Sequence, residues 1–195
     1  MARYLSIHPD EPQQRLLAQA AEVVREGGVV AIPTDSCYAL GCHLGDKDAV
    51  ERIRRIRGVD ERHHLTLMCR DLSEIAQFAR VDNAQYRLLK ATTPGSYTFI
   101  LEGTKELPRR VLHPKRKTIG LRVPAHKVAL ALLAELDEPL LTSTLMLPGD
   151  EAPLTEAWEI QDRLDDHLEL ILDGGYCGIE PTTVVDLTRL PPELI

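Results

Sequence analysis

A cluster of small polar side chains interrupts an apolar stretch near the N-terminus. In GGVVAIPTDSCYALGC, residues 27–42, an apolar run breaks at a proline and gives way to Thr34, Asp35, Ser36, Cys37 and Tyr38. A short continuous apolar run predicts a strand covered on both faces, so the cluster is expected at a strand end. Binding sites in sheets covered by helices gather at strand ends, where loops converge.

Arg122 is the second residue whose position suggests chemistry. It lies inside an otherwise apolar strand candidate, TIGLRVP, where an unpaired charge facing the core would cost several kcal/mol. Two interpretations are open. The guanidinium pairs with a carboxylate of the protein, or it lines a polar cleft and holds a ligand carboxylate through two hydrogen bonds.

Neither glycine-rich phosphate motif, G-x-x-x-x-G-K-[ST] or G-x-G-x-x-G, is present. Any phosphate site must therefore be assembled from side chains and strand-end amides, with candidates Arg57, Lys115, Lys117, Thr118, Arg122 and Ser143. Ser143 has no G-x-S-x-G elbow around it, which argues against a serine hydrolase. The residues favour positioning and charge neutralisation over covalent catalysis.

The charge is unevenly distributed along the 195 residues. The net charge is -7, yet basic residues concentrate in the segments 52–70 and 109–122. Ordinary solvated charges explain most single residues, but two basic segments also predict a polyanion, either nucleotide phosphates or an RNA backbone, lying across them. The expected RNA contacts are Arg54, Arg55, Arg62, Lys115, Arg116 and Lys117.

The four cysteines form no C-x-x-C pair, which argues against a zinc site and a disulfide framework and predicts buried free thiols. No metal ligand set is expected. No apolar segment approaches the ~18 residues of a membrane span, and no signal-peptide core is seen. A cytoplasmic location without membrane contact is therefore expected.

Helical and strand-like patterns alternate along the chain, which predicts one α/β domain over residues 1–195 with helices packed on a mixed or mostly parallel sheet. The first helix is expected to be capped by Asp10 and to stop at Gly27. Further helices are predicted over 46–58, 71–79, 83–92, 126–138 and 154–168, and strands over 29–33, 65–69, 96–103, 118–124, 139–145, 168–175 and 182–188.

Several of these segments carry a resemblance. PTDSCYALG resembles the P-T-E-T-x-Y-G-L-G element of the YrdC-like threonylcarbamoyl-AMP synthases. The order of TTPGSYTFIL, TIGLRVP, LLTSTLMLPG and ILDGGYCGIEPTTVVDLT follows that family through nearly the whole chain. YALGC, FILEGTKELPRR and TSTLMLPG are similar to its YciO branch.

The resemblance implies a twisted, open α/β fold with a basic concave face. It also implies a reaction in which ATP, L-threonine and bicarbonate give threonylcarbamoyl-AMP and pyrophosphate, used to modify an adenosine of tRNA. ATP would be a substrate and would bring Mg²⁺, and tRNA or double-stranded RNA would be a partner.

The resemblance also implies roles for individual residues. The expected threonine contacts are Thr34, Ser36, Tyr38, Arg122 and Thr182. The expected nucleotide contacts are Arg57, His63, Thr118 and Ser143, of which Arg57 and Ser143 are the expected catalytic residues.

The chain departs from the family pattern at the nucleotide end. Arg57 replaces the lysine of a Lys-x-Arg motif, Val59 stands where its arginine belongs, and Leu145 replaces the asparagine of Ser-x-Asn. Loss of one preorganised donor costs ~3 kcal/mol in the transition state. Two alternatives therefore stand beside the synthase: an RNA-binding protein without catalysis, and an enzyme for another carbamoyl, adenylate or modified-nucleoside substrate.

Overall fold

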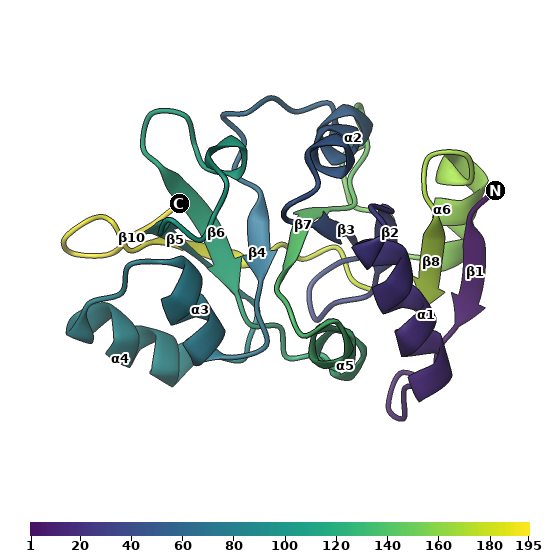
Figure 1. Cartoon of the computed structure of the whole chain (residues 1–195), viewed down its shortest axis with the longest axis horizontal. Helices are drawn as coiled ribbons and strands as arrows, with labels where there is room; N and C mark the ends of the chain where they lie inside the picture. The colour runs from purple at the N-terminus through teal and green to yellow at the C-terminus, as the bar shows by residue number, and fades with distance from the viewer.

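The core of the fold is one ten-stranded sheet with the order β1-β8-β2-β3-β7-β4-β6-β5-β9-β10 (Figure 1). The computed structural model describes residues 1–195. The strands are β1 (Arg3–Ser6), β2 (Val30–Ile32), β3 (Ala39–His43), β4 (Thr66–Met68), β5 (Tyr97–Glu102), β6 (Thr118–Arg122), β7 (Leu140–Thr144), β8 (Leu170–Asp173), β9 (Thr183–Asp186) and β10 (Glu193–Leu194).

The sheet is mixed and open, as predicted. Strand pairs β1–β8, β2–β8, β4–β6 and β5–β9 are parallel. Pairs β2–β3, β3–β7, β4–β7, β5–β6 and β9–β10 are antiparallel. The edge strands β1 and β10 do not pair with each other, so the sheet does not close into a barrel.

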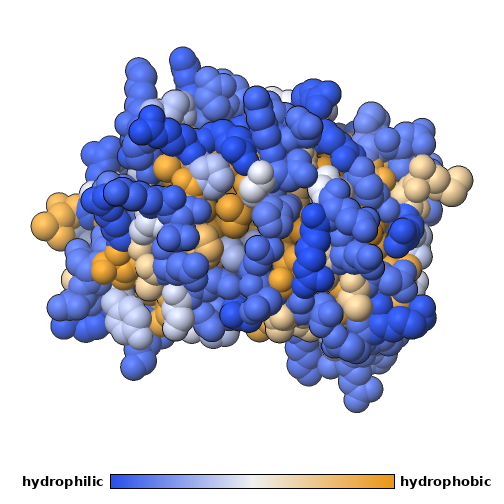
Figure 2. Space-filling view, in the orientation of Figure 1, coloured by the Kyte–Doolittle hydropathy of each residue, from blue (hydrophilic) through white to orange (hydrophobic).

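Six α-helices cover the sheet: α1 (Gln14–Arg25), α2 (Lys47–Arg57), α3 (Leu72–Phe78), α4 (Asn83–Thr92), α5 (Lys127–Leu136) and α6 (Ala157–Leu164). A short 3-10 helix spans Arg109–Val111. The smaller apolar cluster lies under α1 and α5, whereas the larger cluster takes its helical residues from α2, α3, α4 and α6. The face of the molecule in Figure 2 is mainly hydrophilic, with apolar areas between the hydrophilic side chains.

Helix α2 agrees with the sequence prediction at both ends. The Asp46 side chain accepts a hydrogen bond from the Ala49 amide at 2.9 Å, and Gly58 ends the helix with φ of 67°, a conformation that glycine adopts without strain. The predicted cap of the first helix is wrong, because α1 starts at Gln14 after Gln13 and Asp10 lies outside it. Helix α6 is also shorter than predicted.

Strand β3 explains why the polar cluster is ordered. It pairs antiparallel with β2, so the segment between Pro33 and Tyr38 is the connection of a hairpin in the middle of the sheet. A second long connection, from β8 to β9, crosses several strands of the sheet (Figure 1). These two connections bring residues from distant parts of the sequence together at the ends of the central strands.

The four cysteines are buried and unpaired, as predicted. None of the helices has the length and apolar character that crossing a bilayer requires.

Substitutions of Gly58 and Gly149 can be compared to test how closely side chains pack against the end of α2. Both have φ in the left-handed region, 67° and 85°, but a Cβ on Gly58 would lie 2.8 Å from Pro148 Cγ, whereas one on Gly149 would meet nothing within 4 Å. Gly149→Ala is expected to cost about 1 kcal/mol through backbone strain alone. Gly58→Ala should cost clearly more in urea unfolding, and equal losses would contradict the packing argument.

Candidate functional site

A cavity of about 330 Å³ lies where β4 begins and β7 ends. It is lined by Arg57, His63, His64, Thr66, Ser143, Thr144, Met146, Glu151, Pro153, Ile179 and Pro181. Three residues predicted from the sequence for a nucleotide, Arg57, His63 and Ser143, therefore meet in one place. The cavity combines cations, hydroxyls, one carboxylate and apolar side chains, a composition typical of sites for small polar molecules.

Arg57 and Ser143 are in direct contact in this cavity. Arg57 Nη1 donates to Ser143 Oγ at 2.5 Å, and Arg57 Nε donates to the Met146 carbonyl at 2.9 Å. Burial lowers the pKa of Arg57, but a guanidinium keeps its proton at physiological pH. Because Ser143 accepts from Arg57, its own hydroxyl proton is available to a ligand oxygen.

His64 joins the cavity to strand β6. Its Nε2 lies 2.9 Å from Thr118 Oγ1, and its ring stacks on His113 with centroids 5.4 Å apart. Thr118 is itself buried, so its hydroxyl meets His64 rather than solvent. Burial, followed by the charges of His113, Arg116 and His63, lowers the pKa of His64.

A row of threonine hydroxyls continues from this cavity across β4, β6, β5 and the start of β9. A Cβ on Gly120 would lie 3.0 Å from Thr98 Cγ2 and 3.1 Å from Thr66 Oγ1, so these side chains close over the glycine. Thr98 Oγ1 then lies 2.7 Å from Thr182 Oγ1. We call Thr66, Thr98, Thr118 and Thr182 the hydroxyl row.

Arg122 lies on the same face of β6 as Thr118, at the other end of the strand. It is only 4% exposed and forms an ion pair with Asp35. Its Nη1 donates to Ser36 Oγ at 3.1 Å, while its Nε is buried without a partner. The structure thus realises the first interpretation of Arg122, a carboxylate partner within the protein, and leaves one donor free.

Two of the predicted threonine contacts serve the protein itself. The Thr34 hydroxyl donates to the Cys37 carbonyl at 2.6 Å and accepts from the Ser36 and Cys37 amides. Tyr38 is fully buried, and its hydroxyl donates to the Gly175 carbonyl at 2.6 Å. Ser36 and Thr182 remain half-buried beside Arg122 and the hydroxyl row.

The predicted RNA contacts divide into three groups. Arg62, Lys115 and Arg116 line a second cavity of about 470 Å³ together with His113, and Lys117 is exposed next to them. Arg55 is exposed on another side of α2 and lines a different cavity. The prediction for Arg54 is wrong, because its side chain is buried and bonded to Glu51 and to the Arg110 carbonyl.

Sequence patterns missed several residues of the cavity. His64, Glu151, Ile179 and Pro181 line it. Ile179 and Pro181 belong to the segment ILDGGYCGIEPTTVVDLT, which carries the family resemblance, but that resemblance assigned them no role. The adjacent pair His63 and His64, next to Arg62, is the available signal for His64. Leu145, which replaces the expected asparagine, is fully buried in the larger apolar cluster, and Val59 is half-buried.

Comparison with known proteins identifies the family of this chain. A protein-family model for Sua5, YciO and YrdC proteins, described as telomere recombination, matches residues 22–195. The chain belongs to the Sua5/YciO/YrdC family.

Relatives within this family differ in what is known of them. The uncharacterized protein YciO of Escherichia coli K12 is 56% identical over all of this chain and 95% of its own. The crystal structure of E. coli YciO superposes with a TM-score of 0.97 over the same shares. Threonylcarbamoyl-AMP synthase of Pyrococcus abyssi is 32% identical over 90% of this chain and 52% of its own.

A crystal structure of P. abyssi Sua5 complexed with L-threonine has a TM-score of 0.90 and 28% identity, covering 98% of this chain and 56% of that one. The Sua5/YciO/YrdC fold is therefore retained across relatives with a named ligand and relatives without one. The chain matches only about half of the P. abyssi protein.

The depressed pKa of His64 predicts a pH dependence of stability. The unfolded chain binds a proton at this histidine near pH 6.5, whereas the folded chain resists it. Acidification from pH 7.5 to 5.5 therefore favours the unfolded state. His64→Gln should lose less stability than wild type over this interval in urea unfolding. Identical losses in both proteins would contradict the assignment.

Proposed function

We propose that this protein forms an acyl adenylate by a reaction of the threonylcarbamoyl-AMP synthase type. In this reaction, the amine of L-threonine and bicarbonate form a carbamate and release water. A carbamate oxygen then attacks the α-phosphorus of ATP, the bond to the β-phosphate oxygen breaks, and pyrophosphate leaves. The relatives named as synthases and the family membership support this class of reaction.

The unpartnered Nε of Arg122 is the observation that carries the proposal. A buried donor without an acceptor is costly, and a ligand carboxylate would satisfy it with a charge-assisted hydrogen bond. Ser36 lies beside the guanidinium and Thr182 is the last member of the hydroxyl row, so both can contact the polar part of an amino acid. This end of β6 suits the carboxylate of L-threonine.

The cavity at the other end of β6 suits the phosphates. Arg57 neutralises the negative charge that develops on the α-phosphate, Ser143 supplies a hydroxyl donor, and His63 lines the same cavity, whereas Thr118 reaches it only through His64. Mg²⁺ would enter with ATP, and Glu151, the carboxylate of the cavity, is a ligand type that this cation accepts. The protein's part is positioning and charge stabilisation.

The spacing of the two ends fits a single extended ligand. Arg122 and Thr118 are the last and first residues of β6, which separates them by roughly 13 Å at about 3.3 Å per residue. The hydroxyl row lies between them. A molecule with a carboxylate at one end and a phosphate further along can thus contact both ends at once.

Pyrophosphate release should require ATP, threonine and bicarbonate together. Arg122→Lys keeps the charge but loses the planar fork, so threonine affinity measured by calorimetry should fall at least tenfold. Ser143→Ala should slow pyrophosphate release by ten- to a hundredfold. Arg80→Lys, an exposed arginine paired with Glu102, is the matched control and should leave both values unchanged.

Folded protein that releases no pyrophosphate, or releases it equally well without threonine, would contradict the synthase. Threonine binding that persists without turnover would indicate another reaction of the same carbamoyl or adenylate chemistry. Circular dichroism of each variant separates these outcomes from misfolding.

RNA binding is a second proposed function, favoured by the exposed cations around His113. Arg62, Lys115 and Arg116 line a cavity in which Glu61 is the one carboxylate, so cations outnumber it, and the His64–His113 stack connects this cavity to the nucleotide cavity. A phosphate backbone crossing this surface would approach the site where the adenylate forms. This position suits tRNA or double-stranded RNA as a partner.

Double-stranded RNA affinity should fall steeply with salt concentration. Lys115→Glu and Arg116→Glu should each weaken binding several-fold and lower the slope of log K against log salt by about 1. Arg3→Glu, an exposed change on β1 at the far edge of the sheet, is the control and should have little effect. If both variants bind RNA with the affinity of the wild type, this surface is excluded as the RNA-binding site.

A further inference from the structure

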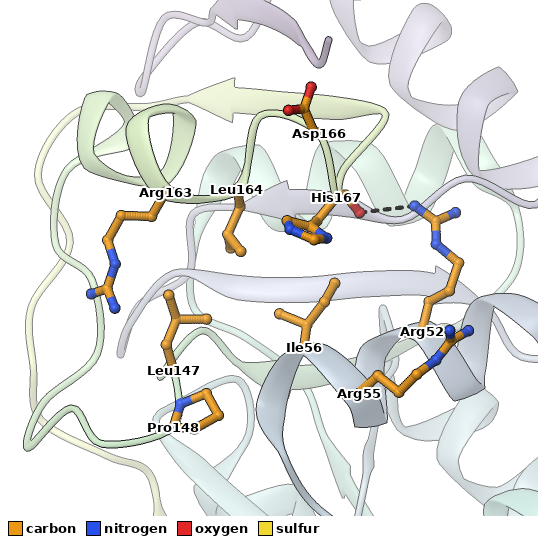
Figure 3. A pocket seen from close by; sticks show the side chains of 9 residues that line it. All are labelled: Arg52, Arg55, Ile56, Leu147, Pro148, Arg163, Leu164, Asp166 and His167. Atoms are coloured by element: carbon orange, nitrogen blue, oxygen red, sulfur yellow. Dashed lines mark hydrogen bonds between the residues drawn. The ribbon is translucent and has the colours of Figure 1, made fainter.

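A separate cavity of about 570 Å³ lies between α2 and the turn that follows α6 (Figure 3). Helix α2 contributes Arg52, Arg55 and Ile56, and the segment after β7 contributes Leu147 and Pro148. The end of α6 and its turn contribute Arg163, Leu164, Asp166 and His167. None of these residues lines the cavity of Arg57 and Ser143, so this is a distinct place on the molecule.

The three arginines of this cavity are not equivalent. Arg52 forms two hydrogen bonds with the Glu169 carboxylate, at 2.7 and 3.1 Å, and a third with the His167 carbonyl. Arg163 pairs with Asp150 at 2.6 Å. Arg55 is exposed and forms no ion pair or side-chain hydrogen bond within the chain. The charge of Arg55 is therefore available to an anion.

Apolar side chains form the centre of the cavity. Ile56, Leu147 and Leu164 converge there, and the imidazole of His167 lies among them (Figure 3). The carboxylate of Asp166 points away from this centre, so it does not oppose an anion near Arg55 (Figure 3). An apolar surface next to a single free guanidinium matches a molecule with an apolar body and one anionic group.

We propose that this cavity binds a small organic anion, a ring or short apolar group that carries a phosphate or a carboxylate. Arg55 holds the anionic group through its fork of N–H donors. Ile56, Leu147 and Leu164 contact the apolar part, and the His167 ring stacks on it. The volume lies within the range of small-molecule sites in proteins.

The wall of this cavity adjoins a segment that lines the nucleotide cavity. Leu147 and Pro148 directly follow Met146, whose carbonyl accepts from Arg57 Nε, and Pro148 packs on the turn of Gly58. A bound anion would therefore contact the segment that orients Arg57. The binding itself does not rest on the proposed function, because no residue of the adenylate site takes part in it.

Calorimetric titration of the full chain with phenyl phosphate tests the proposal, with benzoate, inorganic phosphate and phenol as comparison ligands. We expect one saturable phenyl phosphate site, with inorganic phosphate and phenol each binding at least tenfold more weakly. Benzoate reports whether a carboxylate replaces the phosphate. Arg55→Ala should weaken phenyl phosphate binding at least tenfold, and His167→Ala several-fold.

Two controls separate this cavity from the others. Arg62→Ala, an exposed cation of the loop cavity, should bind phenyl phosphate as wild type does. Arg80→Ala, at an exposed arginine that pairs with Glu102 outside this cavity, should also retain binding, and titration without ATP keeps the result independent of synthase activity. Absence of saturable binding to wild type, unchanged affinity in Arg55→Ala, or inorganic phosphate that binds as tightly as phenyl phosphate would each overturn the proposal.

Discussion

The buried ion pair between Arg122 and Asp35 organises the candidate site. Arg122 stands in a strand whose residues are all buried, so its charge requires a partner. Asp35 meets it from the β2–β3 connection and also accepts from the Ala125 amide at 2.9 Å, which fixes the entry to α5. Removing either partner would leave a charge without compensation in the core. One interaction thus holds the polar cluster, the end of β6 and the start of α5 together.

The second constraint is the position at which apolar side chains under α1 and α5 stop covering one face of the sheet. The smaller cluster under α1 and α5 reaches Met68 on β4 and includes no residue of β5, β6 or β9. Beyond this limit, the same face carries the hydroxyl row and Arg122. Polar side chains on that half of the sheet are tolerated because they bond to one another or face a ligand, so the boundary of the core is also the boundary of the site.

The sequence was sufficient to predict helices and strands where the local signals were strong. Helix α2 was predicted from its apolar spacing, its Asp46 cap and Gly58, and β6 from its apolar run. Strand β3 was missed because its residues follow the polar cluster without a break, and β1 because RYLS has no apolar run. Tyr38 was assigned from the family resemblance and Arg54 from its basic segment, but their surroundings depend on Gly175 and Arg110, which lie far away in the sequence.

The departures at the nucleotide end have different structural consequences. Leu145 occupies core volume, and its amide donates to the Tyr38 carbonyl, so its side chain contributes packing and leaves no donor for a phosphate. Arg57 has five N–H donors, of which Nε and one on Nη1 are used by Met146 and Ser143. The remaining donors can replace contacts that an arginine at position 59 would make, but not its charge. Because charge stabilisation governs the transition state more than the bound state, in the proposed reaction this substitution pattern would reduce the rate of attack on the α-phosphorus more than it would reduce nucleotide binding.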